Sequence, residues 1–153
     1  HGHTKGDAVV RVGGQVRFHG VSMKPGMPQL YASLDGNRHL FGLPGNPLSV
    51  LTGFYELILP ALRRLSGCPG ESCVRHMRLP LAAPFRAAKG NRTEFILARL
   101  RWIGGPAVEP IDSHGSADIV AAALADGMFA VAPGAGQYPE GTAVEFTPCN
   151  PTW

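Results

Sequence analysis

The segment Pro44-Gly45-Asn46-Pro47 has the composition of a loop that brings the start of a helix to an anion. The first amides of a helix have no partner within the helix, and its dipole places about half a positive charge there. Gly45 allows close approach, Asn46 is a favoured N-cap residue, and Pro47 suits the first helical position. The segment therefore predicts a phosphate- or oxyanion-binding loop, although an ordinary capped helix would use the same residues.

Three further side chains in separate segments could hold an anion. Lys24 lies beside Pro25, and a stiff loop lowers the entropy cost of fixing the lysine on a ligand. Arg92 precedes an expected strand, and its guanidinium group can donate two hydrogen bonds to one oxyanion. Ser116 offers a hydroxyl group before a short expected helix. Each of them could equally be a solvated or capping residue, and the sequence identifies no catalytic residue and no metal ligand.

Strands and a hairpin are expected to position the first two loops. Residues 1–7 show no apolar periodicity, so the chain is expected to begin either in a loop or at an arbitrary cut. Alternating apolar and polar residues predict a strand over residues 16–23, which the prolines of the Lys24 loop end. Residues 29–34 and 38–43 read as the two strands of a hairpin, because turn-forming residues separate them.

A long helix is predicted to follow the loop at Asn46. Its end is expected near Ser66, with Gly67 after it, and Pro60 should bend it. Apolar residues recur at helical spacing at Leu48, Leu51, Tyr55, Leu59, Leu62 and Leu65.

The rest of the chain is rich in short strands, with one helix over residues 117–125 that Ser116 opens. Gly or Pro residues punctuate the gaps, a pattern typical of a small barrel or sandwich. The small and polar residues 68–73 make the best domain boundary, so we expect units over 1–72 and 73–153 with few contacts across the join. The strands are expected at residues 74–82, 93–102, 108–111, 128–132 and 143–147.

Composition limits the classes of partner. The chain has 153 residues with a net charge of +3 and no run of like charges, so no nucleic-acid partner is expected. The 16% of charged residues, against about 25% on average, suggests surface reserved for partners. No apolar stretch reaches the roughly 18 residues of a membrane span, and no signal peptide is visible, which predicts a cytoplasmic protein without a membrane partner. The three cysteines lack metal-site spacing and are expected to be structural thiols.

Four segments in this order resemble the MoeA family of molybdopterin molybdotransferases and the related E domain of gephyrin. The resemblance covers roughly residues 16–148. It implies an α/β fold, the C-terminal half of a MoaB/MogA-like molybdopterin-binding domain, followed by a small β-barrel domain. The segments are Phe18-His19-Gly20-Val21-Ser22-Met23-Lys24-Pro25-Gly26, Phe41-Gly42-Leu43-Pro44-Gly45-Asn46-Pro47-Leu48-Ser49, Gly90-Asn91-Arg92-Thr93-Glu94-Phe95 and His114-Gly115-Ser116 with Asp126-Gly127.

The resemblance implies molybdenum cofactor biosynthesis, in which molybdate is inserted into adenylylated molybdopterin with Mg²⁺ by a homodimer. Pro44, Gly45, Asn46, Pro47 and Ser49 would then line the pterin-phosphate pocket. Lys24, Arg92 and Ser116 would match residues that hold molybdate.

One departure from the family pattern bears on catalysis. The family usually has a second lysine where this chain has Met27, which removes a cation from the expected molybdate site. A MoeA-like protein that holds pterin without inserting the metal is therefore the alternative. The family's N-terminal regions complete the active site, so this chain alone is expected to be inactive. A nucleotide-binding module that uses the helix start at Pro47 is a third possibility, without support from a GxxxxGK[ST] motif.

Overall fold

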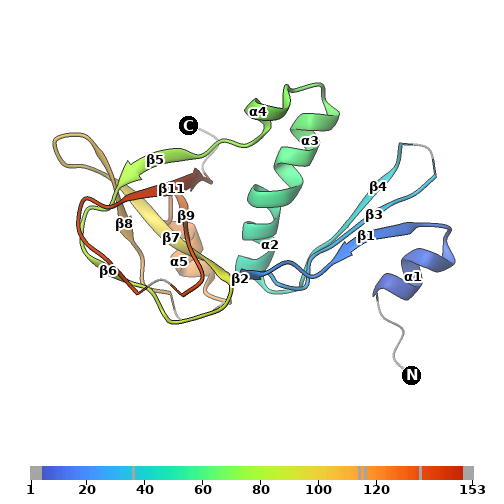
Figure 1. Ribbon diagram of the computed structural model, residues 1–153, viewed down its shortest axis with the longest axis horizontal. Helices are drawn as coiled ribbons and strands as arrows, with labels where there is room; N and C mark the ends of the chain where they lie inside the picture. Colours follow the sequence, from blue (N-terminus) through green and yellow to red (C-terminus); the bar gives the residue numbers. More distant parts are fainter. Residues whose placement is uncertain (1–4, 36, 114, 116, 135, 150–153) are drawn as a thin grey trace.

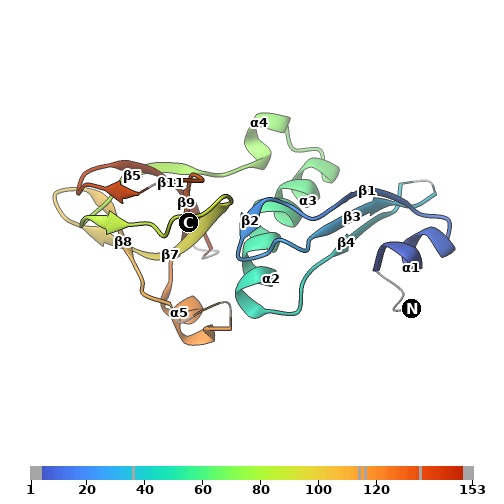
Figure 2. The same ribbon diagram turned by 60° about the horizontal axis from the view of Figure 1, so that its bottom comes forward.

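The computed structural model describes residues 5–35, 37–113, 115, 117–134 and 136–149. A small sheet with a helix at one end lies beside a long helix, and a second, strand-rich unit lies on the other side of that helix (Figures 1 and 2). The arrangement agrees with the α/β unit and the following β domain that the sequence predicts.

The first unit is a three-stranded antiparallel sheet with the order β1-β3-β4. The predicted hairpin is confirmed, since β3 and β4 pair antiparallel. Of the two alternatives for residues 1–7, the loop is wrong for the described part, because a helix begins at Lys5 and buries Val9 against Leu30. Residues 1–4 lie outside the described residues. The elements are α1 (Lys5–Arg11), β1 (Gln15–His19), β3 (Leu30–Ser33) and β4 (His39–Gly42).

The long helix is continuous but locally widened. It comprises α2 (Pro47–Gly53), a π-helical segment η1 (Phe54–Ile58) and α3 (Leu59–Leu65). Pro60 has no amide to donate within the helix, and helices bend or widen at such positions. The amide of Leu59 accordingly donates to the oxygen of Phe54, five residues back. A bend was predicted at Pro60, and the structure shows a π segment just before it.

The predicted end of this helix is confirmed. Gly67 has a φ of 90°, a conformation that L side chains rarely adopt. The amide of Cys68 donates to Arg63 O at 3.0 Å, and the amide of Gly67 donates to Arg64 O at 3.1 Å. These two hydrogen bonds form a Schellman motif, which satisfies the last carbonyl groups of the helix. A short helix, α4 (Gly70–Cys73), then leads to the second unit.

Five strands of the second unit form a closed ring. β7 pairs with β9, β9 with β11, β11 with β5, and β8 with β7. A bridge between Leu81, just after β5, and Val108 of β8 closes the ring, and the amide of Ala82 donates to Val108 O at 2.8 Å. The strands are β5 (Met77–Pro80), β7 (Thr93–Trp102), β8 (Pro106–Pro110), β9 (Gly127–Val131) and β11 (Ala143–Pro148). A short pair, β6 (Phe85–Arg86) and β10 (Gln137–Tyr138), lies outside this ring.

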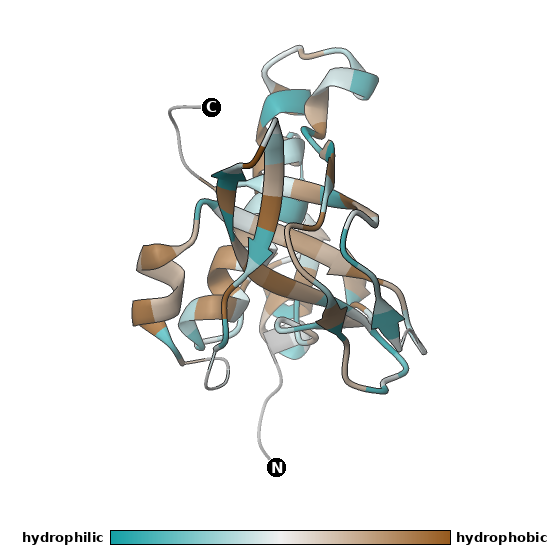
Figure 3. Ribbon diagram, turned by 90° about the vertical axis from the view of Figure 1, so that its left-hand side faces the viewer, coloured by the Kyte–Doolittle hydropathy of each residue, from teal (hydrophilic) through white to brown (hydrophobic). Residues whose placement is uncertain are grey.

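Apolar side chains fill the ring. Brown, apolar stretches and teal, polar stretches share the strands of this unit (Figure 3), as expected when one face is buried. Eight buried residues of this unit form one cluster, comprising Leu81, Ala87, Ala98, Val108, Phe129, Val131, Val144 and Phe146.

The helix expected at residues 117–125 is α5 (Ile119–Leu124), and its cap differs from the expected one. Asp118 occupies the N-cap, and its Oδ1 accepts a hydrogen bond of 2.9 Å from the amide of Ala121. A carboxylate three residues before that amide is correctly spaced to cap it. Ser116 lies outside the described residues.

The two units share more contacts than the sequence predicts. β2 (Met23–Lys24), from the first unit, pairs in parallel with the start of β7. Leu48 of α2, Leu97 of β7 and Ala121 of α5 form a third buried cluster. The expectation of few contacts across the join is therefore wrong, because a sheet and an apolar cluster both span it.

Polar contacts of the π segment add to this join. Thr147 Oγ1 donates to Glu56 Oε1 at 2.6 Å, and Tyr55 Oη donates to the carbonyl oxygen of Cys149 at 2.6 Å. His76 Nε2 lies 3.4 Å from Glu56 Oε2. The widened helix therefore presents two side chains to the last strand.

The thiol of Cys149 should make the fold sensitive to alkali. Burial, with the charge of Glu56, raises the pKa of this thiol from 9.0 to about 12. Between these values the unfolded chain releases a proton that the folded chain keeps, so the free energy of unfolding falls as pH rises from about 9 to about 12. We expect Cys149→Ser to weaken this alkaline loss of stability in urea unfolding curves. Cys68→Ser, which keeps Cys149, should show the full loss, and equal pH profiles for both variants would contradict the prediction.

Candidate functional site

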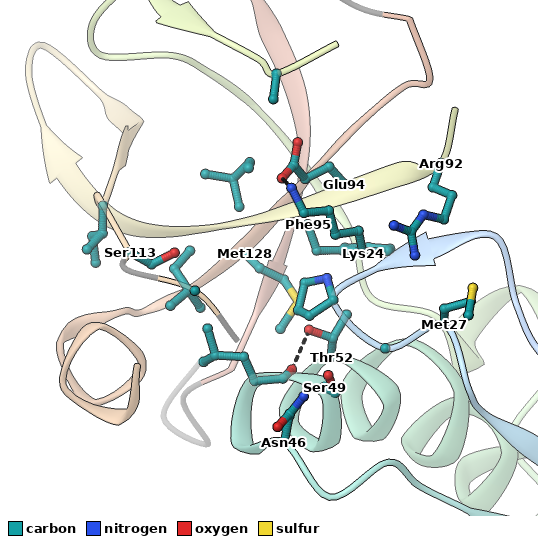
Figure 4. A pocket seen from close by; sticks show the side chains of 18 of the residues that line it. Lys24, Met27, Asn46, Ser49, Thr52, Arg92, Glu94, Phe95, Ser113 and Met128 are labelled. Carbon is teal, nitrogen blue, oxygen red and sulfur yellow. Dashed lines mark hydrogen bonds and ion pairs between the residues drawn. The ribbon is translucent and has the colours of Figure 1, made fainter. Parts of the chain in front are cut away.

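A pocket of about 620 Å³ lies where the two units meet (Figure 4). The loop after β2, the first turn of α2, the start of β7 and the segment after β8 all contribute to its wall. The pairing of β2 with β7 brings the first and third of these elements together. The pocket therefore depends on the join between the units.

Lys24 and Arg92, predicted from separate segments, both line this pocket. Lys24 Nζ lies 2.7 Å from Glu94 Oε1, and the two residues are register partners of β2 and β7. Arg92 is half-buried at the start of the segment that leads into β7, and its side chain makes no ion pair or hydrogen bond with any other described residue. Of the two predicted cations, Lys24 is therefore paired and Arg92 is available to a ligand, and Arg86 is a third cation that lines the pocket.

The third predicted molybdate residue, Ser116, lies outside the described residues. Its described neighbours Ser113 and Gly115 line the pocket. Met27 also lines the pocket with 49% of its surface exposed, so the position where the family usually has a second lysine belongs to the site.

The loop before α2 contributes fewer residues than expected. Asn46 and Ser49 line the pocket, but Pro44, Gly45 and Pro47 are not among its lining residues. Pro44 is buried, whereas Gly45 and Pro47 are exposed to solvent beside the pocket. Two of the five predicted residues therefore line the pocket, and three do not.

Asn46 occupies the N-cap position of α2, as predicted, but its side chain does not cap the helix. Its backbone is extended, with φ −75° and ψ 132°, and its carbonyl oxygen accepts from the amide of Val50 at 3.0 Å. Its side-chain amide lies at the pocket (Figure 4). The predicted side-chain cap is wrong, and this amide can serve a ligand instead.

Gln29, which the sequence pattern does not single out, supports the floor of the site. It is 2% exposed, and its Nε2 donates to Ser49 O at 3.2 Å. A Cβ atom on Gly53 would lie 2.4 Å from Gln29 Nε2, and one on Gly26 would lie 3.0 Å from it. Two glycines thus make room for one buried amide, and nothing in the local sequence indicates this contact.

The rest of the wall combines apolar and polar groups. Phe95 and the fully buried Met128 form an apolar side of the pocket. Thr52 of α2 also lines the pocket, and its Oγ1 donates to Leu48 O at 2.8 Å. Such a mixture of apolar walls and a few polar groups is typical of sites for small organic ligands. The pocket can therefore accept an anion at one side and a flat ring at another.

The described residues do not form a magnesium site by themselves. No group of three His, Cys, Asp or Glu side chains in the described part of the chain could hold a metal ion. Glu94 and Asp112 are the acidic residues among those that line the pocket, and Lys24 already engages Glu94. Mg²⁺ prefers several oxygen ligands in octahedral geometry, and two carboxylates, of which one is already paired, do not supply them.

Two family models match the chain. The model described as "Probable molybdopterin binding domain" matches residues 5–64, and that described as "MoeA C-terminal region (domain IV)" matches residues 78–149. The chain therefore belongs to the MoeA family, and the resemblance seen in the sequence is confirmed.

Curated relatives and solved structures agree with this family. A molybdopterin molybdenumtransferase of Staphylococcus aureus is 32% identical over 86% of this chain and 31% of its own length. One from Haemophilus influenzae is 43% identical over 39% of this chain and 15% of its length. A molybdopterin biosynthesis MoeA protein from Pyrococcus horikoshii superposes with a TM-score of 0.71 and 27% identity, covering 94% of this chain and 34% of that one.

The chain spans about a third of the length of the relatives that it matches along most of its own length. A molybdenum cofactor biosynthesis protein from Pyrococcus furiosus, 23% identical with a TM-score of 0.69, shares the fold. No helix among the described residues is long and apolar enough to cross a membrane.

Proposed function

We propose that this chain supplies one wall of the site at which a longer MoeA-family transferase inserts molybdate into adenylylated molybdopterin. The observation that carries the proposal is the meeting of Lys24 and Arg92, distant in sequence, at one pocket with the start of α2. Cations from different segments that line one pocket can hold an anion between them, because the anion offsets their mutual repulsion. The curated relatives are named molybdopterin molybdenumtransferases, which supports the same reaction.

Each ligand has its own part of the pocket in this proposal. Molybdate, the substrate, binds to Lys24 and Arg92, with Ser116 as a third ligand. The phosphate of the pterin binds at Asn46 and Ser49, where backbone amides at the start of the helix favour an anion. The ring lies toward the apolar side near Phe95, which lines the same pocket.

The remaining parts of the reaction come from outside this chain. We propose that the pterin-binding unit ends near residue 72 and that a homodimer of the longer protein, with Mg²⁺, completes the site in the cytoplasm. The pocket is open to solvent at Lys24, whose side chain is 55% exposed. The chain alone should therefore bind ligands weakly and catalyse nothing.

A pterin-binding scaffold without insertion activity is the second candidate. Two observations favour it. Met27 replaces a cation of the family pattern, and Lys24 already forms an ion pair with Glu94. Both reduce the positive charge that is available to molybdate.

A binding and turnover comparison tests these candidates. The full-length protein is titrated with molybdopterin and with ATP, and insertion is followed by the activation of a molybdenum-free apoenzyme. We expect tight binding of molybdopterin, weaker binding of ATP, and activation. Binding without activation would favour the scaffold, whereas binding of ATP alone would overturn both.

Asn46→Ala should weaken molybdopterin binding by the full-length protein about two- to tenfold. The change removes one neutral hydrogen bond, which contributes about 0.5–1.5 kcal/mol. The fold should be kept, because the Asn46 side chain does not cap α2. Asn37→Ala, in the exposed turn between β3 and β4, is the matched control and should bind normally. Equal dissociation constants for both variants would remove Asn46 from the site.

A further inference from the structure

Glu94 contacts the ammonium group of Lys24, the same group that is proposed to bind an oxyanion. It lines the pocket, and its Oε1 lies 2.7 Å from Lys24 Nζ. The pairing is fixed by the backbone, because Lys24 of β2 is the register partner of Glu94 of β7. The contact therefore follows from the sheet that joins the two units and not from a chance meeting of surface side chains.

The two partners differ in their freedom to move. The side chain of Glu94 is 19% exposed, whereas that of Lys24 is 55% exposed. A lysine has four rotatable methylene groups and can turn toward a ligand, but the shorter, covered carboxylate stays near the strand. Arg92 lines the same pocket as this pair, and all three side chains are labelled in Figure 4. An oxyanion held by both cations therefore lies close to the Glu94 carboxylate.

Two electrostatic effects of this arrangement weaken the binding of an oxyanion. First, Lys24 must break its ion pair with Glu94 before it binds the oxyanion. Second, the Glu94 carboxylate is then unpaired and repels the bound oxyanion. Like charges at such distances repel strongly in a partly covered site. Among the described residues, Glu94 is the ion-pair partner of Lys24, whereas no ion pair is formed by Arg92 or by Asp112, the other acidic residue of the pocket.

We propose that Glu94 competes with the oxyanion for Lys24 and thereby keeps the affinity of the empty pocket for tetrahedral dianions low. Glu94 then limits how far any tetrahedral dianion, sulfate and phosphate as well as molybdate, fills the empty site before the pterin arrives. The inference rests on the proposed function of Lys24 as an oxyanion ligand. A tetrahedral dianion fills only part of a pocket of about 620 Å³, so the remaining space is left for a second ligand.

Calorimetry of the full-length protein with molybdate and with sulfate tests the proposal. Glu94→Gln keeps the size of the side chain and removes its charge, and we expect both anions to bind about three- to tenfold more tightly. Glu109→Gln is the matched control, because Glu109 also pairs with a cation, Arg101, on the same barrel but does not line the pocket. Its affinities should equal those of the unmodified protein. A second variant, Glu94→Ser, should show the same gain if the charge is responsible.

A double-mutant cycle with Lys24→Ala separates competition from a structural role. If Glu94 masks Lys24, removing Lys24 must cost more affinity in the Glu94→Gln background than in the unmodified protein. Unchanged or weaker anion binding by both Glu94 variants overturns the inference and leaves the proposed function intact. If Lys24→Ala has no effect in either background, Lys24 is not an oxyanion ligand, and the proposed function loses its main support.

Discussion

Replacing Arg92 by alanine in the full-length protein is expected to weaken molybdate binding about 10- to 100-fold. Each charge-assisted hydrogen bond contributes about 1.5–3 kcal/mol, and about 1.4 kcal/mol corresponds to a factor of ten. Arg92 has no partner among the described residues, so the change removes a ligand without leaving a protein group unpaired. Calorimetry with molybdate measures the loss, and the assay of cofactor insertion should show a matching rise in KM for molybdate.

Lys24→Ala should have a smaller effect than Arg92→Ala, because Lys24 must leave Glu94 before it binds an anion. Lys89→Ala is the control for overall charge, since Lys89 is exposed in the same loop as Arg92 but does not line the pocket. Its affinity should be unchanged. Equal losses for Lys89→Ala and Arg92→Ala would show a general charge effect and would remove Arg92 from the site.

Local patterns predicted most of the secondary structure because they report local physics. The strand over residues 93–102 is found with the same bounds as β7, since its length and β-branched or apolar residues leave little choice. Gly67 marked the end of the long helix, where a positive φ is required. The hairpin of β3 and β4 was likewise predicted, because its turn residues separate two apolar runs.

Elements that depend on distant partners were not predicted. Helix α1 buries only one fully apolar residue, Val9, and that contact requires the hairpin strands. β2 and β7 pair although they are far apart in the sequence, and β2 has only two residues. Such a pairing leaves no periodic signal, and it explains why contacts across the join were underestimated.

The candidate site shows the same division. Lys24, Arg92 and Asn46 were predicted from residue types at loop and helix ends, Ser49 was implied by the family resemblance, and all four line one pocket. Glu94 stood out only as part of the family pattern, because its effect on Lys24 depends on strand register. Gln29 was missed for a similar reason, since its role depends on the space beside two glycines.

Met27→Lys should tighten molybdate binding about tenfold in the full-length protein. Met27 lines the pocket on the same loop as Lys24 and is 49% exposed, so a lysine can extend there without steric conflict. One added charge-assisted contact contributes about 1.5–3 kcal/mol of binding free energy. The entropy cost of fixing a flexible side chain and the repulsion from Arg92 reduce this gain. Because Glu94 already pairs with Lys24, the new ammonium group would face the ligand without a competing carboxylate. Calorimetry with molybdate measures the change directly.

Two control variants separate a local contact from other effects of the substitution. Val12→Lys adds the same charge at an exposed position of the first unit that does not line the pocket, and it should leave the affinity unchanged. Met27→Gln adds polarity of similar length without charge and should gain little, since a neutral amide donates weaker hydrogen bonds to an anion. If Met27→Lys binds molybdate no better than Val12→Lys, the loop does not reach the oxyanion. The gain should shrink as salt rises, because a half-exposed lysine is screened by ions, and a gain that persists at high salt would indicate a packing effect instead.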